Sequence, residues 1–128
     1  MPLAALVNGQ YLALHGGISS RLQTLDQINE IDRRGEPGDL ESLFNDLLWA
    51  DPIKTKDAPN KTEMPNDRGI SVLFGWKLLR NILKQNALKA LIRAHEQKDE
   101  GYKLHKWAGE NEDPPCITIF SAPNYCQH

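Results

Sequence analysis

Three short apolar runs, each followed directly by residues that can do chemistry, constrain the fold of this chain most strongly. Runs of this length that are bounded by turn residues are typical of buried strands. They are residues 11–14 before His15, 90–94 before His95, and 116–120 before a loop that contains Tyr125. Because reactive groups gather at the carboxyl ends of strands in open α/β sheets, these runs predict a site along one rim of a mixed sheet.

The two histidines are candidate metal ligands, and a structural role is the alternative. His15 and His95 lie far apart in the sequence and form no short metal-binding motif. A lone histidine after a strand is more often a residue whose hydrogen bonds are satisfied within the fold. Gly16 and Gly17 leave a similar choice between a sharp backbone turn beneath a ligand and a plain turn.

Helices are predicted where apolar residues recur at helical spacing. Thr24 and Gln27 form a capping-box pattern before the first helix, and Asn86 suits the C-terminal cap of the third, in which Trp76 is expected to be core. The three patterns cover residues 25–32, 40–48 and 75–86. These helices alternate with the strands, so the sequence predicts an α/β class closed by a terminal hairpin.

The remaining segments are predicted to be turns, loops and an edge strand. Asn8 followed by Gly9 is a strong hairpin signal because both residues tolerate positive φ. Residues 53–65 lack apolar periodicity and are predicted to be a surface loop. The alternation over residues 102–107 predicts a half-exposed strand with His105 at the surface, not a ligand.

One arginine and one aspartate remain as candidates. In residues 66–69, Gly69 allows a turn that presents Arg68 outward, and the guanidinium fork can bind two phosphate oxygens. A solvated surface arginine is the alternative. Asp51 stands before Pro52 at the predicted end of a helix, and we expect it to support the site from behind at most.

Composition excludes several functional classes. The chain has 128 residues, 40% of them hydrophobic, and a formal net charge of -2, so one domain with a core is expected. That charge gives no electrostatic case for nucleic acid or an acidic membrane surface. No apolar stretch approaches the ~18 residues of a membrane span. Cys116 and Cys126 make no disulfide framework, so we expect a reduced compartment, the cytoplasm, with the nucleus as the alternative.

Five motifs resemble one enzyme family. They are LAALVNGQYLALHGGIS, LLWADP, NDRG, LIRAHE followed by GYKLHKW, and ITIFSAPNYC. Their order and approximate spacing resemble the phosphoprotein phosphatase family of serine/threonine phosphatases, and the calcineurin branch in particular. Nearly the whole chain is covered. The family's upstream motifs GDxHG, GDxxDRG and GNHE are absent, so residues 1–128 resemble the C-terminal half of the catalytic domain.

The resemblance implies a fold and a set of roles. It implies part of a two-sheet sandwich flanked by helices, the α/β/β/α architecture of metallophosphatases. His15 and His95 would be ligands to one of two metal ions, iron with zinc or else manganese, and the two ions would activate a water molecule. Arg68 would bind the substrate phosphate and Tyr125 would flank it. Since the general acid and further ligands belong to the absent motifs, the chain by itself is expected to be inactive.

Three functions follow as hypotheses. The first is a piece of an active serine/threonine phosphatase that acts on phosphoserine and phosphothreonine proteins. In that case a calcineurin B-like regulatory subunit is a candidate partner of the full-length protein. The second is a non-catalytic interaction module that pairs an exposed sheet edge with another chain. The third is part of another metallophosphoesterase. No nucleic acid or membrane partner is expected.

Overall fold

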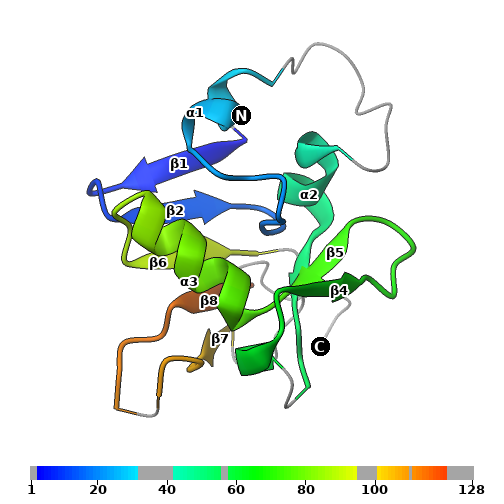
Figure 1. Ribbon diagram of the computed structural model, residues 1–128. Helices are drawn as coiled ribbons and strands as arrows, with labels where there is room; N and C mark the ends of the chain where they lie inside the picture. Colours follow the sequence, from blue (N-terminus) through cyan, green and yellow to red (C-terminus); the bar gives the residue numbers. More distant parts are fainter. Residues whose placement is uncertain (1–2, 32–41, 56–57, 95–100, 110, 121–128) are drawn as a thin grey trace.

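The computed structural model describes residues 3–31, 42–55, 58–94, 101–109 and 111–120, and the fold statements below refer to them. Three helices and one short 3-10 turn accompany two sheets (Figure 1). The helical elements are α1 (Asp26–Asn29), α2 (Leu43–Trp49), α3 (Trp76–Gln85) and the 3-10 turn η1 (Ala58–Asn60). The strands are β1 (Ala4–Val7), β2 (Tyr11–Leu14), β3 (Asp51–Pro52), β4 (Glu63–Pro65), β5 (Val72–Phe74), β6 (Ala90–Arg93), β7 (Tyr102–His105) and β8 (Cys116–Ile119).

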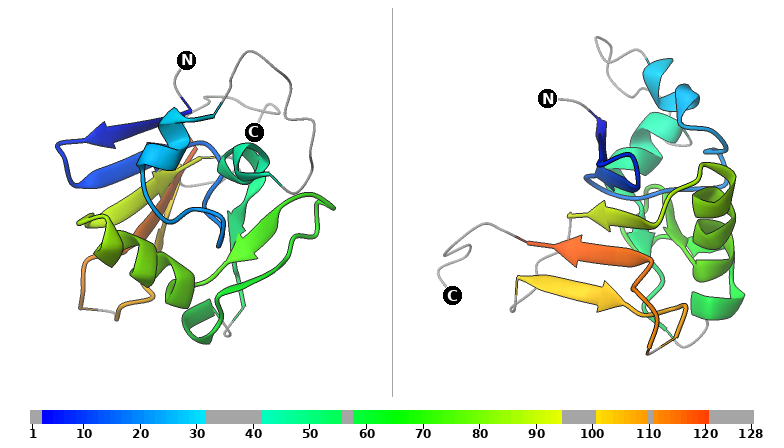
Figure 2. Two further views of the ribbon diagram at one scale, coloured as in Figure 1. Left: turned by 45° about the horizontal axis from the view of Figure 1, so that its top comes forward. Right: turned by 90° about the vertical axis from the view of Figure 1, so that its left-hand side faces the viewer.

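The larger sheet has the strand order β1-β2-β6-β8-β7. Its three central strands, β2, β6 and β8, are parallel, and each edge strand is antiparallel to its neighbour. The right-hand view in Figure 2 shows β6 and β8 pointing the same way and β7 the opposite way. All three predicted apolar runs therefore end at one edge of a mixed sheet, which confirms the predicted fold class.

Two rows of side chains cross the core-facing side of this sheet. The first row contains Leu12, Leu91 and Cys116, which are all buried. The second row, one pleat nearer the carboxyl edge, pairs Leu14 with Arg93 and Arg93 with Thr118. The core is thus apolar in its middle and becomes polar where the parallel strands end.

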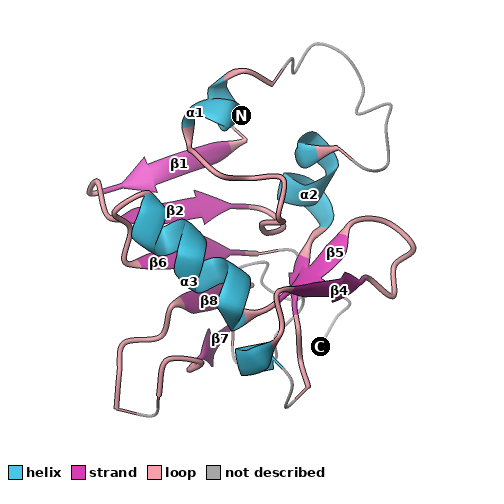
Figure 3. Ribbon diagram, in the orientation of Figure 1, coloured by secondary structure: helices cyan, strands magenta, loops and turns pink. Residues whose placement is uncertain are grey.

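The smaller sheet has the order β3-β5-β4 and lies on the side toward which β2 points (Figure 3). β3 is parallel to β5, and β4 is antiparallel to it, with Met64 opposite Leu73. The prediction of a loop over 53–65 is wrong, because the segment contains η1 and β4. β4 forms by backbone pairing with β5, and such pairing leaves no periodic pattern in a three-residue strand.

α3 provides the apolar cover of the larger sheet and crosses in front of β6 and β8 in Figure 1. It buries Leu78, Leu79, Ile82 and Leu83. The chain leaves the helix at Asn86, as predicted. Trp76 packs against the core but is only half-buried. No helix in the described ranges is both long and apolar enough to traverse a lipid bilayer.

The two shorter helices begin much as predicted but cover less of the chain. The Gln27 side chain accepts a hydrogen bond from the backbone N–H of Thr24 at 2.9 Å, which is one half of the capping box. α1 nevertheless has four residues in place of the predicted 25–32. α2 begins after Ser42, whose hydroxyl accepts from the N–H of Asn45 at 3.2 Å, and the start predicted for it at residue 40 is outside the described residues.

The β1–β2 hairpin is confirmed. Asn8 and Gly9 both have positive φ, at 55° and 68°, and the N–H of Gln10 donates to the carbonyl of Val7 at 3.1 Å. This is the geometry that Asn-Gly favours between antiparallel strands. The hairpin fixes the register of β2 and so places His15 just beyond the end of the strand.

Candidate functional site

His15 follows β2 at the rim where the parallel strands end. Its backbone carbonyl accepts a hydrogen bond from the N–H of Ala94 at 3.0 Å, so the exits of β2 and β6 lie side by side. Ala94 precedes His95, which is outside the described residues. The ligand pair therefore stays a prediction.

The imidazole of His15 is held in its neutral form. Partial burial lowers its pKa below 6.5, and the nearby guanidinium groups of Arg93 and Arg68 lower the pKa further, against an opposite effect of Asp51. A neutral imidazole is the form that binds a metal ion.

Gly16 and Gly17 allow close packing, not a left-handed turn. Neither has a positive φ. A Cβ on Gly16 would collide with the backbone of Leu48, whose carbonyl oxygen would be 2.6 Å away, and one on Gly17 would collide with the ring of Phe74. The absence of side chains lets the chain bend at His15 and Gly16 and pass directly against the end of α2 and against β5. The turn is therefore present, and a ligand above it stays a prediction.

Asp51 stands at the centre of the site. One carboxylate oxygen accepts from Nη2 of Arg93 at 2.8 Å. The other accepts from Nε of Arg68 at 2.7 Å and from the amide of Asn66 at 3.1 Å. Asp51 is 3% exposed, so a single buried carboxylate holds two arginines. This agrees with the expectation that Asp51 supports the site from behind, here through two arginines.

Arg93 is a buried arginine that sequence reasoning did not select. It is 1% exposed, and its Nε donates to the carbonyl of Gly16 while Nη1 donates to the hydroxyl of Thr118 at 3.0 Å. A buried arginine requires a charged partner and several hydrogen bonds, and Asp51 supplies the charge. The available signal was a charged residue inside a run predicted to be a buried strand.

Arg68 is presented by a tight turn, as predicted. The N–H of Gly69 donates to the carbonyl of Asn66 at 3.0 Å, and Gly69 has a φ of 80°. The N–H of Arg68 donates to the side-chain oxygen of Asn66 at 3.0 Å. The Arg68 side chain is 36% exposed and uses Nε for Asp51, while within the described residues its two terminal Nη groups have no protein partner.

The charges at this rim favour an anion. Two guanidinium groups share one carboxylate, which leaves one positive charge in excess among Asp51, Arg68 and Arg93, and Lys54 and Asp67 line the adjacent cavity with one charge of each sign. A cavity of about 410 Å³ opens beside Arg68, and its lining includes Ile53 and Met64. The exposed end of the Arg68 fork is thus available to a phosphate-sized anion.

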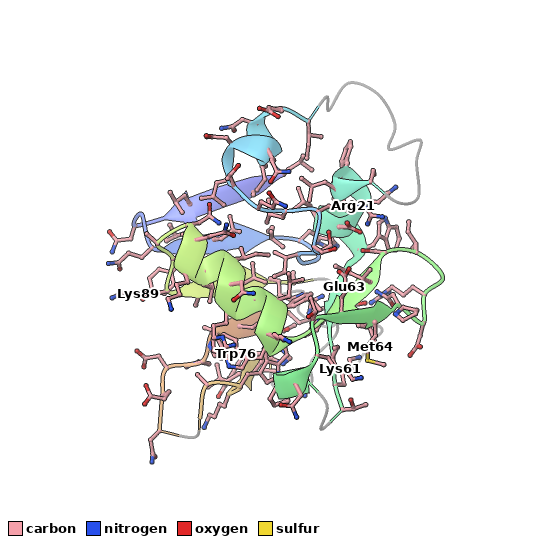
Figure 4. All side chains as sticks on the ribbon, in the orientation of Figure 1. Arg21, Lys61, Glu63, Met64, Trp76 and Lys89 are labelled. Atoms are coloured by element: carbon pink, nitrogen blue, oxygen red, sulfur yellow. The ribbon has the colours of Figure 1, made fainter. Side chains whose placement is uncertain are left out.

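A second buried aspartate fixes the segments around the site. Asp46 has no exposed surface and accepts hydrogen bonds from Ser19 at 2.5 Å, from Ser71 at 2.7 Å and from Arg21 at 3.1 Å. Figure 4 shows Arg21 beside α2, the helix that contains Asp46. Ser19 belongs to the segment after β2 and Ser71 follows the Arg68 turn. α2 therefore holds both segments through one carboxylate.

The structure corrects the prediction for His105. This residue was expected at the surface, but it is 5% exposed, and its Nε2 lies 2.9 Å from the hydroxyl of Thr118. His105 pairs with Cys116, at the end of the apolar row, and its ring lies 5.5 Å from that of Trp107. The alternation could not reveal the hydroxyl partner or the aromatic cover.

The predicted site is only partly within the described residues. Arg68 and His15 are both at the strand-end rim, whereas His95 and Tyr125 lie outside the described ranges. No three potential ligands among the described histidine, cysteine, aspartate and glutamate residues could together hold a metal ion. His15 fits a metal as a neutral donor, but this part of the chain does not supply a full ligand set.

The chain thus combines a mixed α/β sheet with an arginine-bearing rim at the ends of its parallel strands, a geometry that suits a domain acting on phosphate esters. The chain belongs to the calcineurin-like phosphoesterase family, whose model matches residues 1–99. This confirms the resemblance found in the sequence motifs.

Known relatives agree with this assignment. The chain is 44% identical over 135 residues to the serine/threonine-protein phosphatase 2B catalytic subunit A1 of Saccharomyces cerevisiae, covering 98% of the chain and 24% of that protein. It is 39% identical over 127 residues to the serine/threonine-protein phosphatase 5 of Rattus norvegicus, covering 98% and 23%. The chain thus spans about a quarter of the length of these relatives.

A solved structure shares the fold. It is a serine/threonine phosphatase from Saccharomyces cerevisiae with similarity to human phosphatase PP5, and it superimposes with a TM-score of 0.80 at 35% identity. The match covers 98% of this chain and 36% of that structure. The two-sheet architecture described above is therefore the metallophosphatase fold, as expected.

Proposed function

We propose that this chain is part of a serine/threonine protein phosphatase and that Arg68 binds the phosphate of a phosphoserine or phosphothreonine protein. One observation carries the proposal: Arg68 is fixed through Nε to the buried Asp51, while its Nη groups have no partner among the described residues. A planar fork that is oriented at one end and open at the other suits two phosphate oxygens.

The other residues take complementary roles in the proposal. Asp51 orients the guanidinium, and Arg93 prevents the carboxylate from turning away. His15 and His95 would bind metal, and two ions of the iron, zinc or manganese type would supply an activated water and neutralise phosphate charge when bound. Tyr125 would flank the phosphate. The described residues do not complete the ligand set of these ions.

The rest of the proposal concerns a longer protein. The chain covers about a quarter of its phosphatase relatives, which supports the view that it is one part of a longer protein. The order of its motifs points to the C-terminal part of a catalytic domain. The general acid and the remaining metal ligands would then come from residues that this chain does not contain. We infer that the chain by itself is inactive. A calcineurin B-like regulatory subunit is proposed as a partner of the full protein, and phosphorylated proteins as its substrates.

The test is phosphopeptide hydrolysis with added manganese. This 128-residue chain is compared with the longest product recoverable from its own transcript, and we expect only the longer product to be active. In that product Arg68→Ala and Arg68→Lys should both reduce activity strongly, because neither keeps the fork. Arg80→Ala is the matched control, since Arg80 lies on α3 against the Trp76 ring.

Each outcome has a clear meaning. Activity of this chain alone would show that the account of missing ligands is wrong. Full activity of Arg68→Ala would show that Arg68 does not bind the phosphate. A phosphodiester assayed beside the phosphopeptide tests the alternative of another metallophosphoesterase, which predicts faster cleavage of the diester.

One observation favours a second candidate, a non-catalytic interaction module. β1 is an edge strand of the described sheet, and its Leu6 and Val7 are 52% and 46% exposed. An apolar sheet edge is able to pair with a strand from another chain. A stable fold that binds a partner, with no hydrolysis by the longer product, would favour this candidate.

A further inference from the structure

We propose that His105 is a positioning residue for Arg68 and acts through Thr118, Arg93 and Asp51. The inference rests on the proposed function, because it concerns the arginine that is proposed to bind phosphate. His105 is linked to that arginine through three intervening side chains. The sequence suggested only a surface position for this histidine.

The side chains form one continuous series of hydrogen bonds. Nε2 of His105 lies 2.9 Å from Oγ1 of Thr118, which accepts from Nη1 of Arg93 at 3.0 Å. Nη2 of Arg93 donates to Oδ1 of Asp51 at 2.8 Å, and Oδ2 of Asp51 accepts from Nε of Arg68 at 2.7 Å. The first four residues are at most 5% exposed, so water does not replace these bonds readily.

The backbone places these residues in line. Arg93 and Thr118 are direct partners on the parallel strands β6 and β8, and both are buried. His105 is on the adjacent antiparallel strand β7, two residues beyond Lys103, which pairs with Thr118. His105 and Thr118 are therefore diagonal neighbours on one face of the sheet, within reach of each other.

His105 fixes the orientation of the Thr118 hydroxyl. A hydroxyl has one hydrogen to donate and two lone pairs, and Arg93 occupies one lone pair. His105 engages the hydroxyl a second time, in either tautomer of the imidazole. With two partners the hydroxyl holds a single orientation, and Nη1 of Arg93 keeps a fixed acceptor.

Arg93 connects the oriented Thr118 hydroxyl to Asp51 at the rim. Its guanidinium is planar and rigid, so fixing Nη1 on Thr118 and Nε on the Gly16 carbonyl also fixes the direction of Nη2. Nη2 sets the rotation of the Asp51 carboxylate, and the second oxygen of that carboxylate holds Arg68. Loss of the first bond is expected to loosen the last one.

A structural role for the His105 ring is the competing explanation. The ring lies 5.5 Å from that of Trp107, and the Trp107 ring meets Phe74 edge-on at 6.1 Å. Two substitutions separate the explanations. His105→Phe keeps an aromatic ring against Trp107 but removes the hydrogen bond. His105→Gln removes the ring but places an amide group near the position of Nε2.

The experiment follows the Nε–H proton of Arg68 by NMR in this 128-residue chain without phosphate. In the parent chain we expect a resolved signal whose exchange with water is slow, because the proton is bound to Asp51. His105→Phe is expected to accelerate that exchange at least about threefold. His105→Gln is expected to stay within about twofold of the parent.

A second pair of variants tests the same path at its next residue. Thr118→Val keeps the branched shape without the hydroxyl and should accelerate exchange as His105→Phe does. Thr118→Ser keeps the hydroxyl and should not. This pair decides the question if either His105 variant fails to fold.

Inorganic phosphate is then titrated into the same samples. We expect Arg68 to respond in the parent chain, with an apparent Kd about three- to tenfold higher in His105→Phe. Unchanged exchange in both His105→Phe and Thr118→Val would overturn the inference, as would an unprotected Arg68 proton in the parent chain. If exchange changes as expected but phosphate binds no variant, the positioning role stands and the proposed phosphate role of Arg68 fails.

Discussion

Asp51 is the shared counter-ion of two arginines, and we expect it to contribute strongly to the stability of the fold. Its carboxylate faces Arg93, whose side chain is fully buried, and Arg68, whose side chain is 36% exposed. We expect Asp51→Asn to lower the free energy of unfolding by about 3–5 kcal/mol, because Arg93 would keep a buried charge without a counter-ion. Urea denaturation measures this change.

Arg68→Ala is the matched control for that prediction. It removes the partly exposed cation and leaves the buried pair of Asp51 and Arg93 intact. Such half-exposed pairs contribute about 0–1 kcal/mol. Equal losses for Asp51→Asn and Arg68→Ala would contradict the view that the buried pair dominates.

Gly16 and Gly69 allow two causes of destabilisation to be compared, a steric clash with the fold and a strained backbone conformation. Gly16→Ala is expected to cost about 1–3 kcal/mol, because the new Cβ meets the backbone of Leu48, which cannot rotate away. Gly69→Ala meets no atom within 4 Å but has a φ of 80°, so its cost should be about 1 kcal/mol. Urea unfolding of both variants gives the comparison, and a larger loss for Gly69→Ala would refute it.

Sequence reasoning succeeded for residues whose signal is local and failed for those whose partners are distant. The turn that presents Arg68 was predicted because Asn66 and Gly69 are near it in the sequence, whereas its phosphate-binding role came only from the family resemblance. Arg93 and His105 were missed because their hydrogen-bond partners lie on other strands, in particular the hydroxyl of Thr118. Nothing in the residues next to them specifies that hydroxyl.

At the scale of elements, α2 is a short helix that positions both buried aspartates of the site. It holds Asp46 and leads into β3, which begins with Asp51. We expect Ser42→Ala to cost about 1 kcal/mol, since the serine hydroxyl caps the N–H of Asn45 at 3.2 Å. Ser42→Asn should preserve most of the stability because asparagine also accepts at this position. Urea denaturation of the two variants decides, and equal stability of Ser42→Ala and the parent chain would exclude a capping role.

Elements were predictable in proportion to how much of their stability is local. The Asn8–Gly9 hairpin and α3 carry their turn residues and apolar period within a few positions, and both were predicted. β4 has no such pattern and depends on pairing with β5, so it was taken for a loop. α1 shows the reverse error, because a capping box does not specify where a helix ends.

At the scale of the whole molecule, the parallel order of β2, β6 and β8 explains why distant motifs form one site. Each strand ends at the same edge, and the carboxyl-end residues of each strand enter the rim without any short motif connecting them. The predicted rim was therefore correct in its arrangement of strands. The predicted set of site residues was incomplete, because it lacked Arg93 and Thr118, which the second row of the sheet places behind the rim.

The larger sheet also has an exposed edge, which follows from its strand order. In the described part of the chain β1 is an outer strand, and Leu6 and Val7 on it are about half exposed. Unpaired backbone groups together with apolar side chains on an edge strand promote strand pairing between molecules. We therefore expect this chain to self-associate as its concentration rises, in competition with any natural partner of the edge.

Leu6→Lys should reduce that association, since a charge on an edge strand opposes edge-to-edge pairing. Sedimentation velocity over a concentration series measures it. Asn60→Lys is the control because it adds the same charge at an exposed position of η1, which packs against α3 and not against β1. If both substitutions reduced association equally, net charge would be the cause. If only Leu6→Lys did so, the β1 edge would be the contact, and the apolar surface there would be the part of the fold that requires a partner.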